Sequence, residues 1–103
     1  MMTSDVLQRP GERLVAVVVT HQRLPQLQTT LRALLAQPQE HLAAILVVDN
    51  ASRDGTADWL AQNPDPRLTV VHSGANLGGA GGFELGMRRA MAQLSPDWIV
   101  VMD

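Results

Sequence analysis

The chain has 103 residues, a formal net charge of −2, no cysteine, and a hydrophobic fraction of 46%. These values allow one small domain with a real core, and they exclude a disulfide framework and a thiolate metal site. The slight negative charge argues against a nucleic-acid partner, because nucleic acids are bound by basic surfaces.

The N-terminal segment, residues 1–12, is polar and contains Pro10-Gly11 without any periodicity, so we expect a flexible tail there. It lacks the charged and apolar regions of a signal peptide. The longest apolar run, Leu42–Val48, has seven residues, whereas a membrane-spanning helix needs about 20. We therefore expect a cytoplasmic protein whose folded part is residues 13–103.

The first expected element is a strand over residues 14–20, because Leu14–Val19 is a β-branched run without alternation, typical of a strand buried on both faces. A helix follows, opened by Pro25 at a tolerated first-turn position and ended at Gln37-Pro38. Its leucines fall within about 100° of one helical face. They are Leu24, Leu27, Leu31, Leu34 and Leu35.

The second apolar run predicts a second buried strand near residues 43–49, which leads into the acidic turn VVDNASRDGT at 47–56. In that turn we expect Gly55 to supply a permissive backbone and Thr56 to cap a short helix over 56–62. Asn63-Pro64-Asp65-Pro66 then breaks this helix.

A weaker third strand is expected over Leu68–His72, followed by a glycine-rich loop through Ser73–Gly82 and a helix ending near Leu94. A fourth strand, Trp98–Met102, follows Pro96. The predicted buried face of the last helix spans an arc of about 100°. Its members are Phe83, Met87, Ala90, Met91 and Leu94.

This alternation of strands and helices predicts an α/β fold: a three-layer, Rossmann-like parallel sheet with right-handed crossovers and the strand order 3-2-1-4. In that order the tips of the first and fourth strands lie side by side at the switch point, where open α/β sheets bind ligands. We therefore expect Thr20 and Asp103 to lie close together.

Polar side chains at the strand tips indicate a nucleotide site. Asp49 can accept hydrogen bonds from a ribose hydroxyl or a base N–H, although acids in such loops also cap turns, and the spacing leaves both roles open. Arg23, just after the first strand, can clamp a phosphate. We assign no role to His72 and interpret His21 as a solvated loop residue.

The stretch from Asn76 to Gly82 has four glycines within five residues, just before a helix. Unhindered amides at a helix N-terminus favour an anion such as a diphosphate, so Asn76, Gly78 and Gly79 are expected at the nucleotide. The alternative is a flexible connection that packs the helix closely on the sheet. The stretch is not the dinucleotide fingerprint, because it follows the third strand and Glu84 replaces a small residue.

Four blocks of sequence, taken in order, resemble a known family. They are Thr20-His21-Gln22-Arg23, VVDNASRDGT at 47–56, NLGGAGGFELG at 76–86 and WIVVMD at 98–103. From about Val15 to residue 103 the chain resembles the nucleotide-binding half of a family 2 glycosyltransferase with the GT-A fold. The stretch at 76–86 looks most like the galactofuranosyl- and rhamnosyltransferase branch, with Phe83-Glu84 replacing the Arg-Asn pair of the commoner pattern.

The resemblance implies a nucleotide-diphosphate-sugar donor, typically a UDP- or dTDP-sugar, and a Mn²⁺ or Mg²⁺ ion. The sugar would pass to a glycan or lipid-linked acceptor, as in cell-wall polysaccharide biosynthesis. Thr20 and Arg23 would line the nucleotide pocket, and Asp49 would hydrogen-bond the base. Asp103 would be the first acid of the family's Asp-x-Asp motif, near the ribose and the metal.

The resemblance also predicts that the second acid, the acceptor site and the general base follow residue 103. We therefore expect residues 13–103 to be a truncated domain, inactive alone, from a protein that is cytoplasmic or peripheral at the membrane. Its apolar surface around Trp98, Ile99 and Met102 is expected to promote self-association. The alternative function is a non-catalytic Rossmann-like nucleotide-binding module, in which Asp49 holds an adenosine ribose.

Overall fold

The computed structural model describes residues 12–103, so the expected tail, residues 1–12, lies outside this range except for Glu12. The seven expected elements are present in the expected order. They are β1 (Leu14–Thr20), α2 (Leu24–Leu35), β2 (Ala44–Asp49), α3 (Thr56–Gln62), β3 (Leu68–His72), α4 (Gly78–Gln93) and β4 (Trp98–Met102). Within the described range, no helix combines the length and the hydropathy that a bilayer crossing requires.

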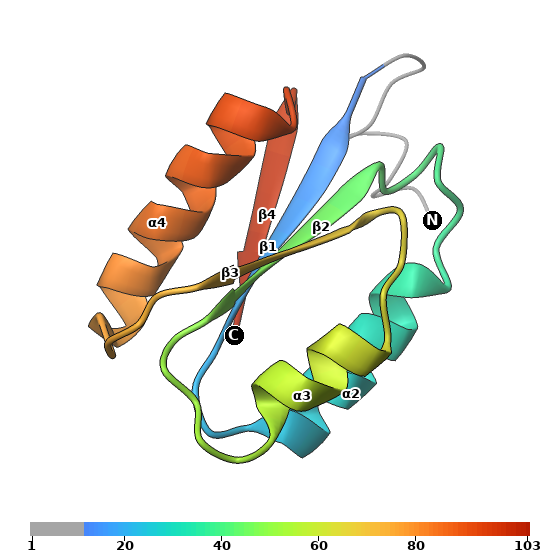
Figure 1. Cartoon of the computed structure of the whole chain (residues 1–103). Coiled ribbons are helices and arrows are strands. Elements are labelled where there is room, and N and C mark those ends of the chain that lie inside the picture. The colour runs from blue at the N-terminus through green and yellow to red at the C-terminus, as the bar shows by residue number, and fades with distance from the viewer. Residues whose placement is uncertain (1–11) are drawn as a thin grey trace.

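The four strands form one sheet in the order β3-β2-β1-β4, and all three pairings are parallel. This confirms the predicted order 3-2-1-4. Helix α4 covers one face of the sheet, and α2 and α3 cover the other (Figure 1). The registers Thr20–Asp49 and Asp49–His72 align the carboxyl ends of β1, β2 and β3, so the polar residues that follow these strands gather at one edge.

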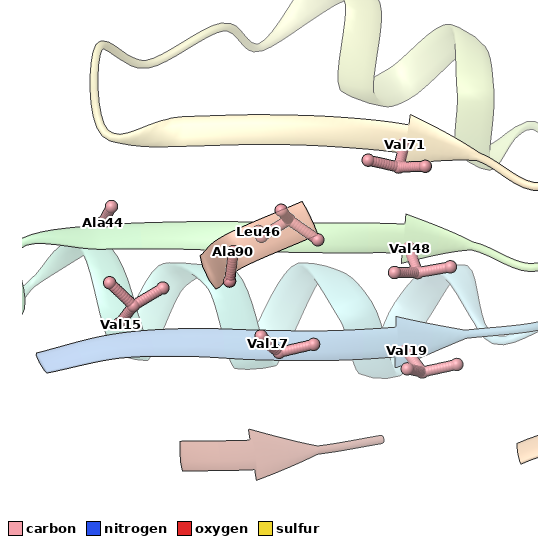
Figure 2. Close-up of a cluster of buried hydrophobic side chains, with 8 residues drawn as sticks. All are labelled: Val15, Val17, Val19, Ala44, Leu46, Val48, Val71 and Ala90. Carbon is pink, nitrogen blue, oxygen red and sulfur yellow. The ribbon is translucent and has the colours of Figure 1, made fainter. Parts of the chain in front are cut away.

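The core is built on the two central strands, β1 and β2. Alternate side chains of each strand point to opposite faces of the sheet, so each strand contributes to the packing on both faces. On the α4 side, the buried cluster includes Val15, Val17 and Val19 of β1 with Leu46 and Val48 of β2 (Figure 2). Their neighbours along the same strands pack against α2 and α3 instead. Burial on both faces explains why β1 and β2 are continuous apolar runs without alternation.

The structure corrects the predicted start and buried face of α4. The helix begins at Gly78, inside the glycine-rich stretch, and its buried residues are Gly82, Gly86 and Ala90. Met87 and Met91, predicted to be buried, are 39% and 69% exposed. The physical reason is distance: a Cβ on Gly82 or Gly86 would come within 2.7 or 2.5 Å of a valine of β1. Two other members of the predicted face, Phe83 and Leu94, are partly buried and pack against the same core cluster.

The structure also corrects the cap of α3. The N-cap residue is Gly55, whose φ of +89° confirms the need for a permissive backbone there. Thr56 is instead the first helical residue and is fully buried. Its amide and its hydroxyl donate to Asp54 Oδ1, at 3.3 and 2.5 Å, so Asp54 supplies the side-chain acceptor that was expected from Thr56.

The apolar surface of β4 differs in part from the expectation. Trp98 is exposed as predicted, whereas Ile99 and Met102 are half-buried and pack against the two core clusters. The other exposed apolar side chains of the strand are Val100 and Val101. The indole N–H of Trp98 donates to Glu12 Oε2 at 3.1 Å.

Candidate functional site

The loop after β1 and the acidic turn after β2 are locked together by hydrogen bonds. The amide of Gln22 donates to Ser52 Oγ at 3.0 Å, and the amide of Arg53 donates to Gln22 Oε1. The amide of Leu24, at the start of α2, donates to Asp54 Oδ2 at 2.9 Å. These bonds cross from one strand tip to the next, so the two loops form a single platform at the carboxyl edge of the sheet.

Asp54 has a structural role in this platform. Donation from the Thr56 hydroxyl, supported by the backbone amides of Leu24 and Thr56, lowers the pKa of the Asp54 carboxyl below its ordinary value of 3.8. The carboxylate is therefore ionised in the folded protein at neutral pH and serves as a fixed acceptor between α2 and α3.

A cavity of about 240 Å³ opens beside this platform, between the tips of β1, β2 and β4 and the N-terminus of α4. It is lined by Val19, His21, Arg23, Asn50, Asn76, Gly78, Gly79, Phe83 and Asp103. Five of the residues predicted for the site therefore share this cavity: Arg23, Asn76, Gly78, Gly79 and Asp103. The lining is mostly polar at the strand tips, with Phe83 on the helix side.

Thr20 lies beside this cavity and is almost fully buried. Together with Arg23 and Asp103 it lines a small adjoining space. The tips of β1 and β4 therefore meet as predicted, with Thr20 and Asp103 on one surface. Val18 and Leu27, which line the same small space, belong to the core cluster on the α2 side of the sheet. Thr20 therefore lies on that side, next to Arg23 and Asp103, which line both spaces.

Asp49 is also buried and does not line the cavity. Its Oδ1 accepts from the amide of Ser52 at 3.1 Å, and its Oδ2 lies 3.1 Å from Nδ1 of His72. A carboxylate has about four acceptor positions, so these two contacts leave acceptor capacity for a further donor. His72, to which we assigned no role, is the partner that orients this carboxylate.

Asn50 lines the cavity although it was not among the residues predicted for the site. Only 2% of the residue is exposed to solvent. Its Oδ1 accepts from the amide of Leu77 at 2.8 Å and from Ser73 Oγ at 3.2 Å, and its Nδ2 donates to the carbonyl of Gly78 at 3.1 Å. Asn50 therefore connects the tip of β2 to the start of α4.

His21 lines the cavity and is exposed in the loop after β1, as expected, and its ring also has a bonding partner. Its Nδ1 lies 2.6 Å from the carbonyl oxygen of Asn50. Because a carbonyl oxygen can only accept, Nδ1 carries the hydrogen, and Nε2 of the neutral ring is an acceptor. Nε2 lies 3.5 Å from Nδ2 of Asn76, across the cavity wall.

The N-terminus of α4 presents backbone amides at the cavity. The amide of Leu77 is bound by Asn50, and that of Gly78 donates to Asn76 Oδ1 at 2.9 Å. The next two amides, of Gly79 and Ala80, have no intrahelical acceptor at this end of a helix, and the N-cap residue Leu77 provides no side-chain acceptor. Such amides, with the helix dipole, favour an anion.

The cavity lining includes one carboxylate, that of Asp103, which is the type of group that can bind a divalent cation. Asp103 is an exposed carboxylate on the cavity wall, and within residues 12–103 no three His, Cys, Asp or Glu side chains cluster as a complete cage. Mg²⁺-type ions are commonly held by one or two carboxylates, with phosphate oxygens and water completing the shell. Asp103 can therefore supply one protein ligand.

Comparison with known proteins decides the family. The sequence model described as Glycosyl transferase family 2 matches residues 15–103. The chain belongs to glycosyl transferase family 2. It is 44% identical over 94 residues to galactofuranosyltransferase GlfT1 of Mycolicibacterium smegmatis, an alignment that covers 89% of this chain and 30% of that protein. GlfT1 of Mycobacterium tuberculosis is 43% identical over 98 residues, with the same two coverages.

A solved structure of a similar protein supports the GT-A-like fold of this family 2 domain. The mannosyltransferase PcManGT from Pyrobaculum calidifontis, in complex with GDP-Man and Mn²⁺, superposes with a TM-score of 0.65 and 30% sequence identity. The match covers 81% of this chain and 26% of that chain. The family 2 domain described here thus spans about 30% of the length of the galactofuranosyltransferases that it matches.

Proposed function

We propose that this family 2 domain binds the nucleotide diphosphate of a sugar donor, a UDP- or dTDP-sugar, as part of a galactofuranosyltransferase-like enzyme. The observation that carries the proposal is the cavity at the carboxyl edge of the sheet, where Arg23, Asp103 and the first turn of α4 meet. The 44% identity to GlfT1 supports the galactofuranosyl branch. The acceptor would be a glycan or a lipid-linked saccharide.

In this proposal the diphosphate lies against the first turn of α4. The amides of Gly79 and Ala80 donate to its oxygens, and the guanidinium of Arg23 pairs with them from the β1 side. The base lies toward Thr20 and Asp49, where the carboxylate that His72 and Ser52 orient accepts a base N–H. Asn76 and Gly78 complete the wall between the phosphates and His21.

Asp103 would hold a Mn²⁺ or Mg²⁺ ion, and the similar mannosyltransferase structure contains Mn²⁺. When bound, such an ion neutralises charge on the leaving diphosphate. Arg23 and the positive end of α4 act on the same charge, because they lie on two sides of the cavity. We assign acceptor binding and proton removal to regions of such an enzyme outside this domain.

Titration of the 103-residue chain with nucleotides, followed by NMR, tests the donor. We expect UDP to shift the backbone amides of Arg23, Asp49 and Gly79 more than AMP or NAD does. Larger shifts with GDP would assign the donor of the mannosyltransferase type. Equal or larger shifts with NAD would favour the non-catalytic nucleotide-binding module and contradict the proposal.

A pair of arginine variants gives the matched control. Arg23→Ala should weaken UDP binding about tenfold, since a charged hydrogen bond to phosphate is lost. Arg32→Ala removes the same charge from the exposed surface of α2, away from the cavity, and should leave the UDP affinity unchanged. Equal weakening in both variants would show that only the net charge matters.

A further inference from the structure

The first turn of α4, at the candidate site, has little intrinsic helical stability. Four of its first five residues are glycines, and glycine is among the poorest helix formers. Gly78 also has a φ of +74°, outside the helical region. Helix propensity does not hold this turn in place, and the N-cap residue Leu77 makes no side-chain cap. A local restraint is the bond from the Gly78 amide to Asn76 Oδ1 at 2.9 Å.

The buried side chain of Asn50 restrains this turn from the neighbouring strand tip. Its Oδ1 accepts from the amide of Leu77 while its Nδ2 donates to the carbonyl of Gly78. The side-chain amide of Asn50 is therefore bound to two consecutive residues of the turn. The same oxygen also accepts from Ser73 at the tip of β3. Asn50 thereby ties α4 to two strand tips.

The backbone of Asn50 makes the restraint rigid. Its amide donates to the carbonyl of Thr20 at 2.8 Å, and its carbonyl accepts from His21 Nδ1 at 2.6 Å. The backbone of Asn50 is therefore also fixed to the end of β1 and the loop after it, and this defines the position from which its side chain extends. Movement of Asn50 would shift His21 and the first turn of α4 together, and both line the cavity.

We propose that Asn50 is a positioning residue, which orders the glycine-rich first turn of α4 so that the amides of Gly79 and Ala80 face the donor diphosphate. This inference rests on the proposed function and adds to it the residue that prepares the phosphate subsite. Asn50 acts through the backbone of α4, because its own polar atoms are already bound to Leu77, Gly78 and Ser73.

The test compares Asn50→Ala with Val71→Ala in the 103-residue chain, under conditions where both remain folded. Val71 is a buried core residue of β3 that does not line the cavity, so its variant reports general destabilisation. We expect Asn50→Ala to weaken UDP binding about tenfold and to speed hydrogen exchange at Leu77, Gly78 and Gly79 by a similar factor. Val71→Ala should leave both quantities within about twofold of the wild type after correction for global unfolding.

Equal loss of UDP affinity in both variants would overturn the inference, as would wild-type affinity in Asn50→Ala despite faster exchange. Exchange in the unaltered chain provides a test that needs no variant. The Leu77 amide should exchange slowly although it precedes the helix, and an amide there as fast as an open loop would also overturn the inference. A wild-type chain that binds neither UDP, dTDP nor GDP would instead reject the proposed function itself.

Discussion

Gly86 of α4 lies directly against Val17 of β1. A Cβ atom on Gly86 would come within 2.5 Å of Val17 Cγ1 and 3.0 Å of Val48 Cγ2. Both valines are fully buried in the centre of the sheet, so neither side chain has free space into which it can move. We expect Gly86→Ala to lower the free energy of unfolding by about 1–3 kcal/mol, the usual cost of overpacking a core.

Gly79→Ala is the matched control for this prediction, measured by urea unfolding followed by circular dichroism. Gly79 lies in the same helix, and a Cβ there would meet nothing within 4 Å. Alanine is the better helix former, so we expect the stability to stay the same or rise by up to about 1 kcal/mol. A Gly86→Ala variant as stable as Gly79→Ala would contradict the close packing of α4.

Asp54 accepts hydrogen bonds from the starts of α2 and α3, and its contribution to the stability of the fold should depend on pH. Its folded-state pKa lies below the ordinary value of 3.8 because Thr56 and the amides of Leu24 and Thr56 donate to the carboxylate. A depressed folded pKa stabilises the fold fully at pH values above the unfolded pKa. That contribution is lost as the pH falls through the folded pKa.

Asp54→Asn, which cannot ionise, isolates this contribution. We expect the wild type to be the more stable of the two at pH 7, and the difference to shrink as the pH falls below about 4. Urea unfolding of both proteins at a series of pH values measures it. A stability difference that stays constant down to the lowest pH would show that the charge of Asp54 does not contribute.

The strands and their order could be predicted because they depend on local pattern and on general topology. The β-branched runs of β1 and β2 are long enough to identify central strands, and right-handed crossovers restrict the arrangements. The acidic turn likewise predicted its own Gly55 conformation. The convergence of Thr20 and Asp103 then followed from the strand order alone, without knowledge of any side-chain contact.

The contact face of α4 and the role of Asn50 could not be predicted in this way. Counting large apolar residues indicated Met87 and Met91, whereas the distance between helix and sheet selects Gly82 and Gly86. That distance is a tertiary quantity that the helical pattern does not contain. The bonds from Asn50 to the start of α4 span 27 and 28 residues of sequence. The sequence shows only an asparagine in a turn, and it does not distinguish an asparagine that forms the turn from one that binds a distant helix.

The outer edge of β4 should promote self-association of the 103-residue chain. β4 ends the sheet, and its sequence WIVVM carries no charge. Trp98 and Val101 are 46% and 44% exposed. An uncharged edge strand with unpaired backbone groups is a template for pairing with a second copy, so we expect a dimer whose fraction rises with concentration in light scattering.

Lysine substitutions distinguish the two edges of the sheet. Val101→Lys places a charge on the edge strand β4 and should shift the chain toward the monomer. Thr69→Lys places the same charge on β3, the opposite edge, and should leave the dimer intact. A wild-type chain that is monomeric at every concentration, or a dimer that only Thr69→Lys disrupts, would reject pairing through β4.

Asp103 should affect turnover more than folding, when it is tested in a transferase that contains this domain. Asp103 is an exposed carboxylate at the tip of β4, so Asp103→Asn should change the stability by less than about 0.5 kcal/mol. Negative charge grows on the diphosphate as it leaves, and a metal ligand acts mainly at that stage. We expect kcat to fall by about 100-fold or more, and EDTA to abolish turnover until Mn²⁺ or Mg²⁺ is added. Full activity in EDTA would remove the metal from the proposed mechanism.

Asp49 should show the opposite kinetic pattern in the same enzyme. A contact to the base is made equally in the ground state and in the transition state, so its loss should raise the donor KM and leave kcat within a few-fold. Asp49→Asn keeps an acceptor for the Ser52 amide but loses a carboxylate oxygen, and His72→Ala removes the partner that orients that carboxylate at 3.1 Å. We therefore expect both variants to raise the KM for the UDP-sugar, with the larger increase for Asp49→Asn. If Asp49→Asn instead lowered kcat at constant KM while Asp103→Asn raised KM, the roles proposed for the two acids would be reversed.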